Sequence, residues 1–162
     1  MKLLLRTLTA FLLGLAITAA MLFLPAGTWC YPGAWLFMAL LFIPILIMGV
    51  VLLIKNPELL RKRLEMKERE KEQRSVVALS GLLLVGSFIV AGLDFRFGWS
   101  HVSSVVVIIA SIALLVSYAL YAEVLRENVY LSRVVEVQQG QRVIDTGLYG
   151  IVRHPMYSAV SL

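Results

Sequence analysis

The chain has 162 residues, of which 60% are hydrophobic and 15% are charged, and its formal net charge is +5. Soluble globular domains carry about 25% charged residues, so this composition excludes an ordinary soluble domain, as does a mean hydropathy of +0.86. The positive charge does not call for nucleic acid, because the distribution of basic residues around membrane spans accounts for it. We therefore expect an integral membrane protein with membrane lipids, and no nucleic acid, as partners.

Four apolar runs without a charge dominate the sequence, at residues 8–24, 34–54, 76–93 and 102–122. Each is close to the roughly 20 residues that a helix needs to cross the hydrocarbon core of a bilayer. A further apolar segment begins at about Pro155. The pattern predicts an all-α, polytopic integral membrane helical bundle. We expect one transmembrane domain over residues 1–162, with four complete spans and the start of a fifth.

The first run could also be a cleaved signal peptide. Lys2 and Arg6 supply a basic start, and Thr18-Ala19-Ala20 is a weak cleavage-like site. However, the apolar sequence continues through Leu24, and a second run follows at once. This continuation favours a retained helix.

The basic residues have a one-sided distribution between the runs. All of the 15 Lys and Arg residues except Arg96, hence 14, fall on one side if the spans alternate in direction. The positive-inside rule makes that side cytoplasmic. We therefore expect a multi-pass protein whose N-terminus, loop 55–75 and connector 123–154 are cytosolic.

Local signals indicate structure in both cytosolic segments. Asn56 suits a helix N-cap and Pro57 suits the first helical position, so loop 55–75 is predicted to form a short helix on the headgroups. Contact with anionic lipid is the functional alternative for this helix. In the connector, residues 134–138 and 142–145 are β-prone, which predicts a hairpin or an extended loop.

The connector leads into a polar motif at the mouth of the last apolar segment. It runs Gly147-Leu148-Tyr149-Gly150-Ile151-Val152-Arg153-His154-Pro155-Met156-Tyr157. Arg and His are costly at membrane depth, so an intramembrane pair is a functional-site hypothesis by default. A simpler interpretation is that Arg153 only anchors a helix by snorkelling, with the tyrosines as interfacial aromatics. The joint spacing of the motif favours ligand binding.

The motif and the residues before it resemble a known enzyme signature. The elements are Gln138, Arg142-Val143-Ile144, Thr146-Gly147-Leu148-Tyr149 and Arg153-His154-Pro155-Met156-Tyr157. Together they resemble the isoprenylcysteine carboxyl methyltransferase family and the related membrane phospholipid methyltransferases. Asn56-Pro57-Glu58-Leu59-Leu60, followed by Arg63, is similar to the family's loop after its second span. The combination is specific for the superfamily and does not name the substrate.

This resemblance implies an all-helical membrane enzyme that uses S-adenosylmethionine and a lipophilic acceptor, such as an isoprenylcysteine carboxylate that arrives from the membrane. Carried over by position, the cofactor-binding residues would be Gln138, Arg142, Val143, Ile144, Tyr149, Arg153, His154, Pro155, Met156 and Tyr157. The transfer calls for neither a catalytic triad nor a metal. We expect no histidine-based metal site, because the two histidines, His101 and His154, fall on opposite predicted faces.

Two other functions stay open at the level of the sequence. Membrane sterol reductases resemble this architecture but use NADPH, whose 2'-phosphate would call for extra basic residues. A non-catalytic membrane protein is the second possibility. Members of the methyltransferase family continue beyond the fifth segment with another helix and a polar tail, whereas this sequence ends at Leu162. We therefore expect the 162-residue chain to be incomplete and inactive as given.

Overall fold

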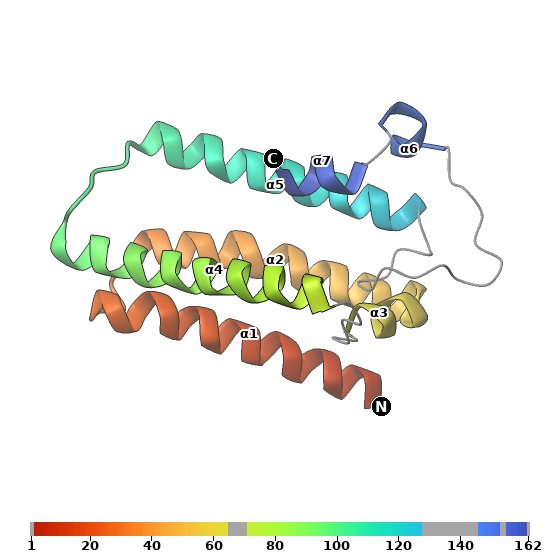
Figure 1. The fold of residues 1–162 in the computed structure, drawn as a ribbon, viewed down its shortest axis with the longest axis horizontal. Helices are drawn as coiled ribbons and strands as arrows, with labels where there is room; N and C mark the ends of the chain where they lie inside the picture. The colour runs from red at the N-terminus through yellow and green to blue at the C-terminus, as the bar shows by residue number, and fades with distance from the viewer. Residues whose placement is uncertain (1, 65–70, 128–145, 153–154, 162) are drawn as a thin grey trace. The chain divides into compact units, whose positions relative to one another are not determined.

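A computed structural model describes residues 2–64, 71–127, 146–152 and 155–161 (Figure 1). These residues form seven helices and, within the described ranges, no strand. The helices are α1 (Lys2–Ala26), α2 (Pro32–Lys55), α3 (Pro57–Leu64), α4 (Lys71–Phe97), α5 (Ser104–Glu127), α6 (Leu148–Ile151) and α7 (Pro155–Ser161). The hairpin or extended loop predicted over residues 134–145 lies outside the described residues.

Four of the helices have the length and composition of membrane spans. They are α1, α2, the Val77–Phe97 part of α4, and α5, with 25, 24, 21 and 24 residues. Large apolar side chains are exposed along them; Leu82 and Leu83 of α4, for example, are 69% and 66% exposed. Such surfaces are stable in hydrocarbon and unfavourable in water. The chain is thus an all-α multi-pass membrane protein, as predicted, and α7 begins where the fifth segment was expected.

The helices extend further than the apolar runs that predicted them. α1 begins at Lys2 instead of residue 8, and α4 begins at Lys71, within the predicted loop 55–75. α5 continues to Glu127, so its last residues fall within the predicted connector 123–154. Charged residues end an apolar run without ending a helix, because Lys, Glu and Arg have good helix propensity. The apolar runs therefore marked the spans but not the ends of the helices.

The described chain forms two compact units. The first comprises Met1–Leu46 with Lys67–Val102, and the second comprises Ile47–Met66 with Ser103–Leu162. α2 contributes its first part to one unit and its last part to the other. The single transmembrane domain expected from the sequence therefore stays a prediction.

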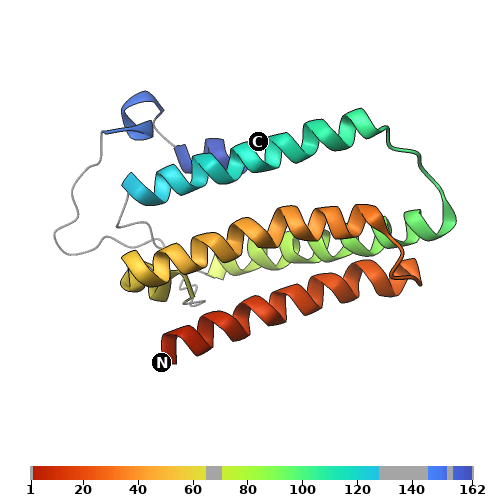
Figure 2. The same ribbon diagram turned by 180° about the vertical axis from the view of Figure 1, so that it is seen from behind.

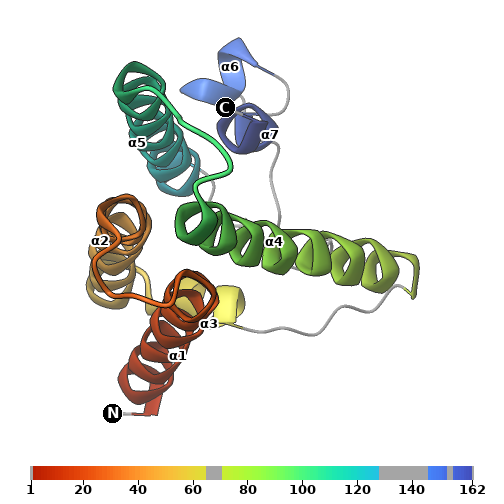
Figure 3. The same ribbon diagram turned by 90° about the vertical axis from the view of Figure 1, so that its left-hand side faces the viewer.

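Apolar packing and a close approach of backbones hold the first unit together. Its core cluster consists of Leu22, Phe23, Ala34, Met38 and Phe42. α1 and α4 belong to this unit and lie side by side (Figure 3). They meet at Gly92, where an added Cβ would lie 2.6 Å from the carbonyl oxygen of Leu22. Small residues at such crossings let membrane helices approach closely.

One end of the first unit is rich in aromatic contacts. Tyr31 stacks on Phe95 with ring centroids 4.0 Å apart, and its hydroxyl donates to the carbonyl oxygen of Ala91 at 3.4 Å. The guanidinium of Arg96 lies 3.5 Å from the position that a Cβ on Gly27 would take. The α1–α2 turn and the end of α4 therefore lie at the same end of this unit, as alternating spans require.

In the second unit, α3 begins with the predicted cap. The backbone N–H of Leu59 donates to Oδ1 of Asn56 at 3.1 Å, and Pro57 is the first helical residue. Leu59 and Leu60 are only 2% and 6% exposed, so the apolar side of this short helix is buried. The predicted short helix in loop 55–75 is thus confirmed over Pro57–Leu64.

α7 packs along α5 in the same unit (Figure 2). The hydroxyl of Ser117, midway along α5, donates to the carbonyl oxygen of Ala159 at 2.8 Å. Ala159 is buried, as are Val124 and Leu125 near the end of α5. Because the hydrogen bond is directional, it fixes α7 against α5 more specifically than apolar contact alone.

Candidate functional site

The candidate site is the segment at residues 146–157, called here the signature segment, together with the part of α5 that it contacts. Four of the predicted cofactor-binding residues are described, and all belong to the second unit: Tyr149, Pro155, Met156 and Tyr157. The other six lie outside the described residues, and their assignment stays a prediction: Gln138, Arg142, Val143, Ile144, Arg153 and His154.

The signature segment begins with a turn that depends on glycine. Gly147 has φ 55° and ψ −130°, a backbone conformation that residues with a Cβ rarely adopt. The turn lets the N–H of Tyr149 donate to the carbonyl oxygen of Thr146 at 3.1 Å, and the N–H of Gly150 to that of Gly147 at 3.2 Å. Gly147 therefore directs the chain into α6, which carries Tyr149.

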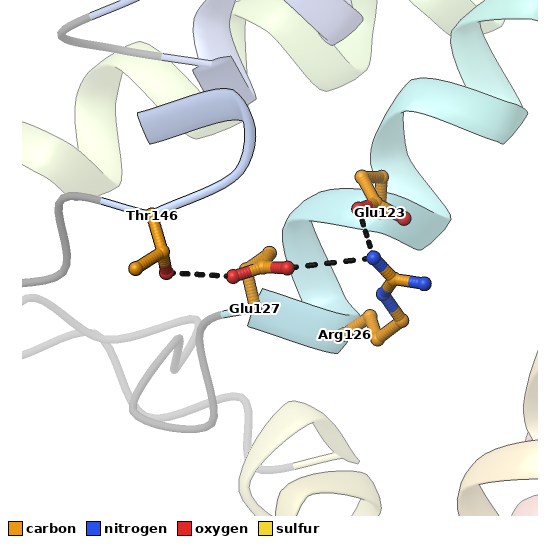
Figure 4. A network of polar contacts seen from close by, with 4 residues as sticks. All are labelled: Glu123, Arg126, Glu127 and Thr146. Atoms are coloured by element: carbon orange, nitrogen blue, oxygen red, sulfur yellow. Dashed lines mark hydrogen bonds and ion pairs between the residues drawn. The ribbon is translucent and has the colours of Figure 1, made fainter. Parts of the chain in front are cut away.

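The end of α5 holds the start of this turn through a polar network (Figure 4). The hydroxyl of Thr146 donates to Oε2 of Glu127 at 2.8 Å. The other carboxylate oxygen of Glu127 faces the guanidinium of Arg126 at 3.4 Å, and Arg126 also pairs with Glu123 at 2.6 Å. The contact joins residues 19 positions apart, so the last turn of α5 and the signature segment form one local structure.

The remaining described site residues begin α7. Pro155 is buried at the first position of this helix, where its missing N–H would have no helical partner. Met156 is half-buried, whereas Tyr157 is 72% exposed. Tyr149 on α6 is half-buried, and α6 lies beside the beginning of α7 in Figures 1 and 3. The structure thus places the four residues on two adjacent short helices near the end of α5.

A second long-range contact ties α3 to α5. The guanidinium of Arg63 donates to the hydroxyl of Tyr121 and lies over its ring, 5.1 Å from the centroid. Arg63 belongs to the loop that resembles the methyltransferase family, and Tyr121 lies about two helical turns before Glu127. The loop after the second span is therefore joined to the helix that also holds the signature segment.

Sequence reasoning missed Glu127 and Tyr121 as parts of this arrangement. Glu127 carried no specific signal, because Glu123 offers the same carboxylate nearer to the end of the predicted span 102–122. Tyr121 carried none, since it lies within an apolar run and its partner is 58 residues away.

The described residues of the signature segment are of the types that commonly line ligand sites. Two tyrosine side chains offer hydroxyl groups, and Met156 and Pro155 offer apolar surface. Sites for small molecules commonly combine apolar walls with a few placed polar groups. Comparisons with protein-family models, with curated proteins and with solved structures find no match for this chain.

Proposed function

We propose that this protein is a membrane methyltransferase that uses S-adenosylmethionine and methylates a carboxylate on a lipophilic, isoprenylcysteine-like acceptor. The observation that carries the proposal is the geometry of Gly147. Its positive φ strains any residue with a Cβ, and a Cβ there would also displace the Glu127 carboxylate from its place over the turn. The fold therefore favours the glycine of the methyltransferase-like signature, at the place where the chain turns into the helix that carries Tyr149.

The residues present in the signature segment suit the proposed methyl donor. Tyr149 and Tyr157 offer hydroxyl groups, and Met156 offers a polarizable apolar surface. The sequence adds Arg153 and His154 between the two short helices. An adenosyl compound with an amino-acid tail has both apolar and strongly polar parts, and this set of side chains matches both.

The chemistry explains why so few polar side chains suffice. A bound sulfonium donor supplies a methyl group whose departure leaves a neutral thioether, so no acid is needed. The acceptor carboxylate is anionic at neutral pH, since ordinary carboxyl pKa values are about 4, so no base is needed. The chain has to align the two ligands and exclude water. A dry pocket favours the transfer, because the opposite charges of donor and acceptor cancel during it.

The proposal places the site on the cytoplasmic side. Its support is the distribution of Lys and Arg, of which all but Arg96 fall on one side of alternating spans. The contact of Arg96 with Gly27 agrees with alternation in the first unit. A lipophilic acceptor would then reach the signature segment from the inner leaflet.

Ligand binding tests the proposal. The purified protein, in the longest form that its reading frame encodes, is titrated in lipid nanodiscs with S-adenosylhomocysteine and, in parallel, with NADPH by calorimetry. We expect the first ligand to bind and the second not to bind. Tyr157→Phe and His154→Ala should each weaken binding by about 1–3 kcal/mol, the value of a polar contact that the bound ligand buries. Tyr31→Phe removes a hydroxyl of the same kind from the first unit and serves as the matched control.

The outcomes separate the candidate functions. Binding of NADPH without S-adenosylhomocysteine would indicate a reductase, and binding of neither would favour a non-catalytic membrane protein. Unchanged affinity in both site variants would show that the motif only anchors a helix at the membrane surface.

A further inference from the structure

Glu127 is partly buried although it is the last residue of α5. Its side chain is 20% exposed, compared with 72% for its neighbour Arg126. Oε2 of Glu127 accepts the hydroxyl of Thr146 at 2.8 Å (Figure 4). This is a charge-assisted hydrogen bond, the stronger kind, and it spans 19 residues of sequence.

The two carboxylate oxygens of Glu127 have separate partners. While Oε2 accepts from Thr146, Oε1 faces the guanidinium of Arg126 at 3.4 Å. Arg126 is in turn held by Glu123 at 2.6 Å. One carboxylate oxygen is therefore contacted from α5 and the other from Thr146.

The same carboxylate also occupies the space over Gly147. A Cβ at residue 147 would lie 2.8 Å from Cδ and 3.0 Å from Oε1 of Glu127. The side chain of Glu127 thus contacts two consecutive residues, one through a hydrogen bond and one through packing. Both contacts fall on the turn that directs the chain into α6.

These two residues set the position of Tyr149. The carbonyl oxygen of Thr146 accepts the N–H of Tyr149, and the carbonyl oxygen of Gly147 accepts the N–H of Gly150. We propose that Glu127 is a positioning residue, which holds Thr146 and Gly147 so that α6 presents Tyr149 to the methyl donor. The functional part of this inference rests on the proposed methyltransferase activity, whereas the structural part does not.

Two readouts test the inference on the full chain in nanodiscs. The first is hydrogen exchange at the amides of Tyr149 and Gly150, and the second is the affinity for S-adenosylhomocysteine. Glu127→Ala should speed hydrogen exchange at both amides. It should also lower the affinity for S-adenosylhomocysteine by about tenfold or more, as expected for loss of a hydrogen bond to a charged group. Glu127→Gln keeps an oxygen that accepts the hydrogen bond from the Thr146 hydroxyl. This variant should therefore retain most of the amide protection and most of the ligand affinity. Asp94→Ala, which removes a carboxylate of the first unit that is bonded only to Ser100 in the described contacts, should leave both unchanged.

A double-mutant cycle adds a second, independent measurement. Thr146→Val removes the hydroxyl at nearly constant volume, so it should reproduce the faster exchange of Glu127→Ala and add little to it in the double variant. Additive effects would overturn the inference, as would unchanged exchange in Glu127→Ala. If Glu127→Ala does not fold, Thr146→Val alone decides, and unchanged exchange there overturns the inference.

The two proposals can fail separately. If the unmodified chain does not bind S-adenosylhomocysteine, the proposed function fails, and hydrogen exchange still decides whether Glu127 positions α6. If the ligand binds but Glu127→Ala changes neither affinity nor exchange, the function stands and the positioning role is wrong.

Discussion

Gly92 and Gly86 lie on the same helix but should respond in opposite ways to the same substitution. Both are in α4 within the first unit. A Cβ on Gly92 would lie 2.6 Å from the carbonyl oxygen of Leu22 and 3.2 Å from the backbone nitrogen of Ala26. A Cβ on Gly86 meets no atom of the described chain within 4 Å, apart from its own helix. Gly92→Ala should therefore destabilise the protein, and Gly86→Ala should not.

The magnitude follows from the contact distances. Ordinary contact begins at 3.4 Å, so α1 and α4 must separate at Gly92 by the difference from 2.6 Å, about 0.8 Å. No rotamer change relieves the clash, because the oxygen of Leu22 belongs to the backbone. Gaps of about 0.5–1 Å forfeit a quarter to a half of the dispersion energy of the atoms concerned. Overpacking of this kind costs about 1–3 kcal/mol, and we expect the upper part of that range.

Helix propensity acts against this loss and dominates in the control. Replacing Gly by Ala within a helix stabilises by about 0.8–1 kcal/mol. The net effect of Gly92→Ala should then be a loss of about 2 kcal/mol, while Gly86→Ala should gain up to about 1 kcal/mol. Reversible unfolding in mild detergent, followed by circular dichroism, measures both. Equal effects at the two positions, or an unchanged Gly92→Ala variant, would refute the close approach of α1 and α4.

Three further predictions concern topology and the second unit. Reporters fused after Gln73 and after Gly98 should report cytoplasmic and external locations, and the reverse pattern would contradict the positive-inside assignment. Asn56→Ala should lower the free energy of unfolding by about 1 kcal/mol through loss of the N-cap, whereas Asn56→Asp should leave that free energy nearly unchanged. Tyr121→Phe keeps the ring under Arg63 but removes the hydrogen-bond acceptor; we expect a loss of about 1 kcal/mol in chemical denaturation, and Tyr121→Leu should cost more than Tyr121→Phe.

The sequence was sufficient where a structure depends on local chemistry. Four apolar runs predicted the four spans, because crossing hydrocarbon requires about 20 apolar residues in a row. Asn56 followed by Pro57 predicted the start of α3, because capping involves only neighbouring residues. The apolar runs did not indicate the helix ends at Lys2 and Glu127, because charged residues can continue a helix beyond the apolar segment.

The sequence was insufficient where distant residues meet. Gly86 and Gly92 are alike in sequence, and only the arrangement of α1 against α4 makes Gly92 essential. The partner of Thr146 is 19 residues away, so no local pattern identified Glu127 as part of the site. The role of Gly147 was anticipated only through the family resemblance, and the structure supplies its physical reason in a positive φ and an occupied Cβ position.

The two units depend on different interactions, and this difference makes the proposals separable by experiment. In lipid, apolar surface alone does not drive helices together, so close packing at small residues and interhelical hydrogen bonds contribute most. The first unit combines close packing at Gly92 with one longer hydrogen bond from Tyr31, whereas the second has the shorter hydrogen bonds of Ser117 and Thr146. Gly92→Ala should therefore lower the unfolding midpoint and leave ligand affinity unchanged well below that midpoint. Thr146→Val should lower the ligand affinity and leave the unfolding midpoint unchanged, because the contact of Thr146 orders a short segment that contributes little to global stability. If both variants changed the unfolding midpoint and the ligand affinity in the same way, the signature segment and the first unit would unfold together.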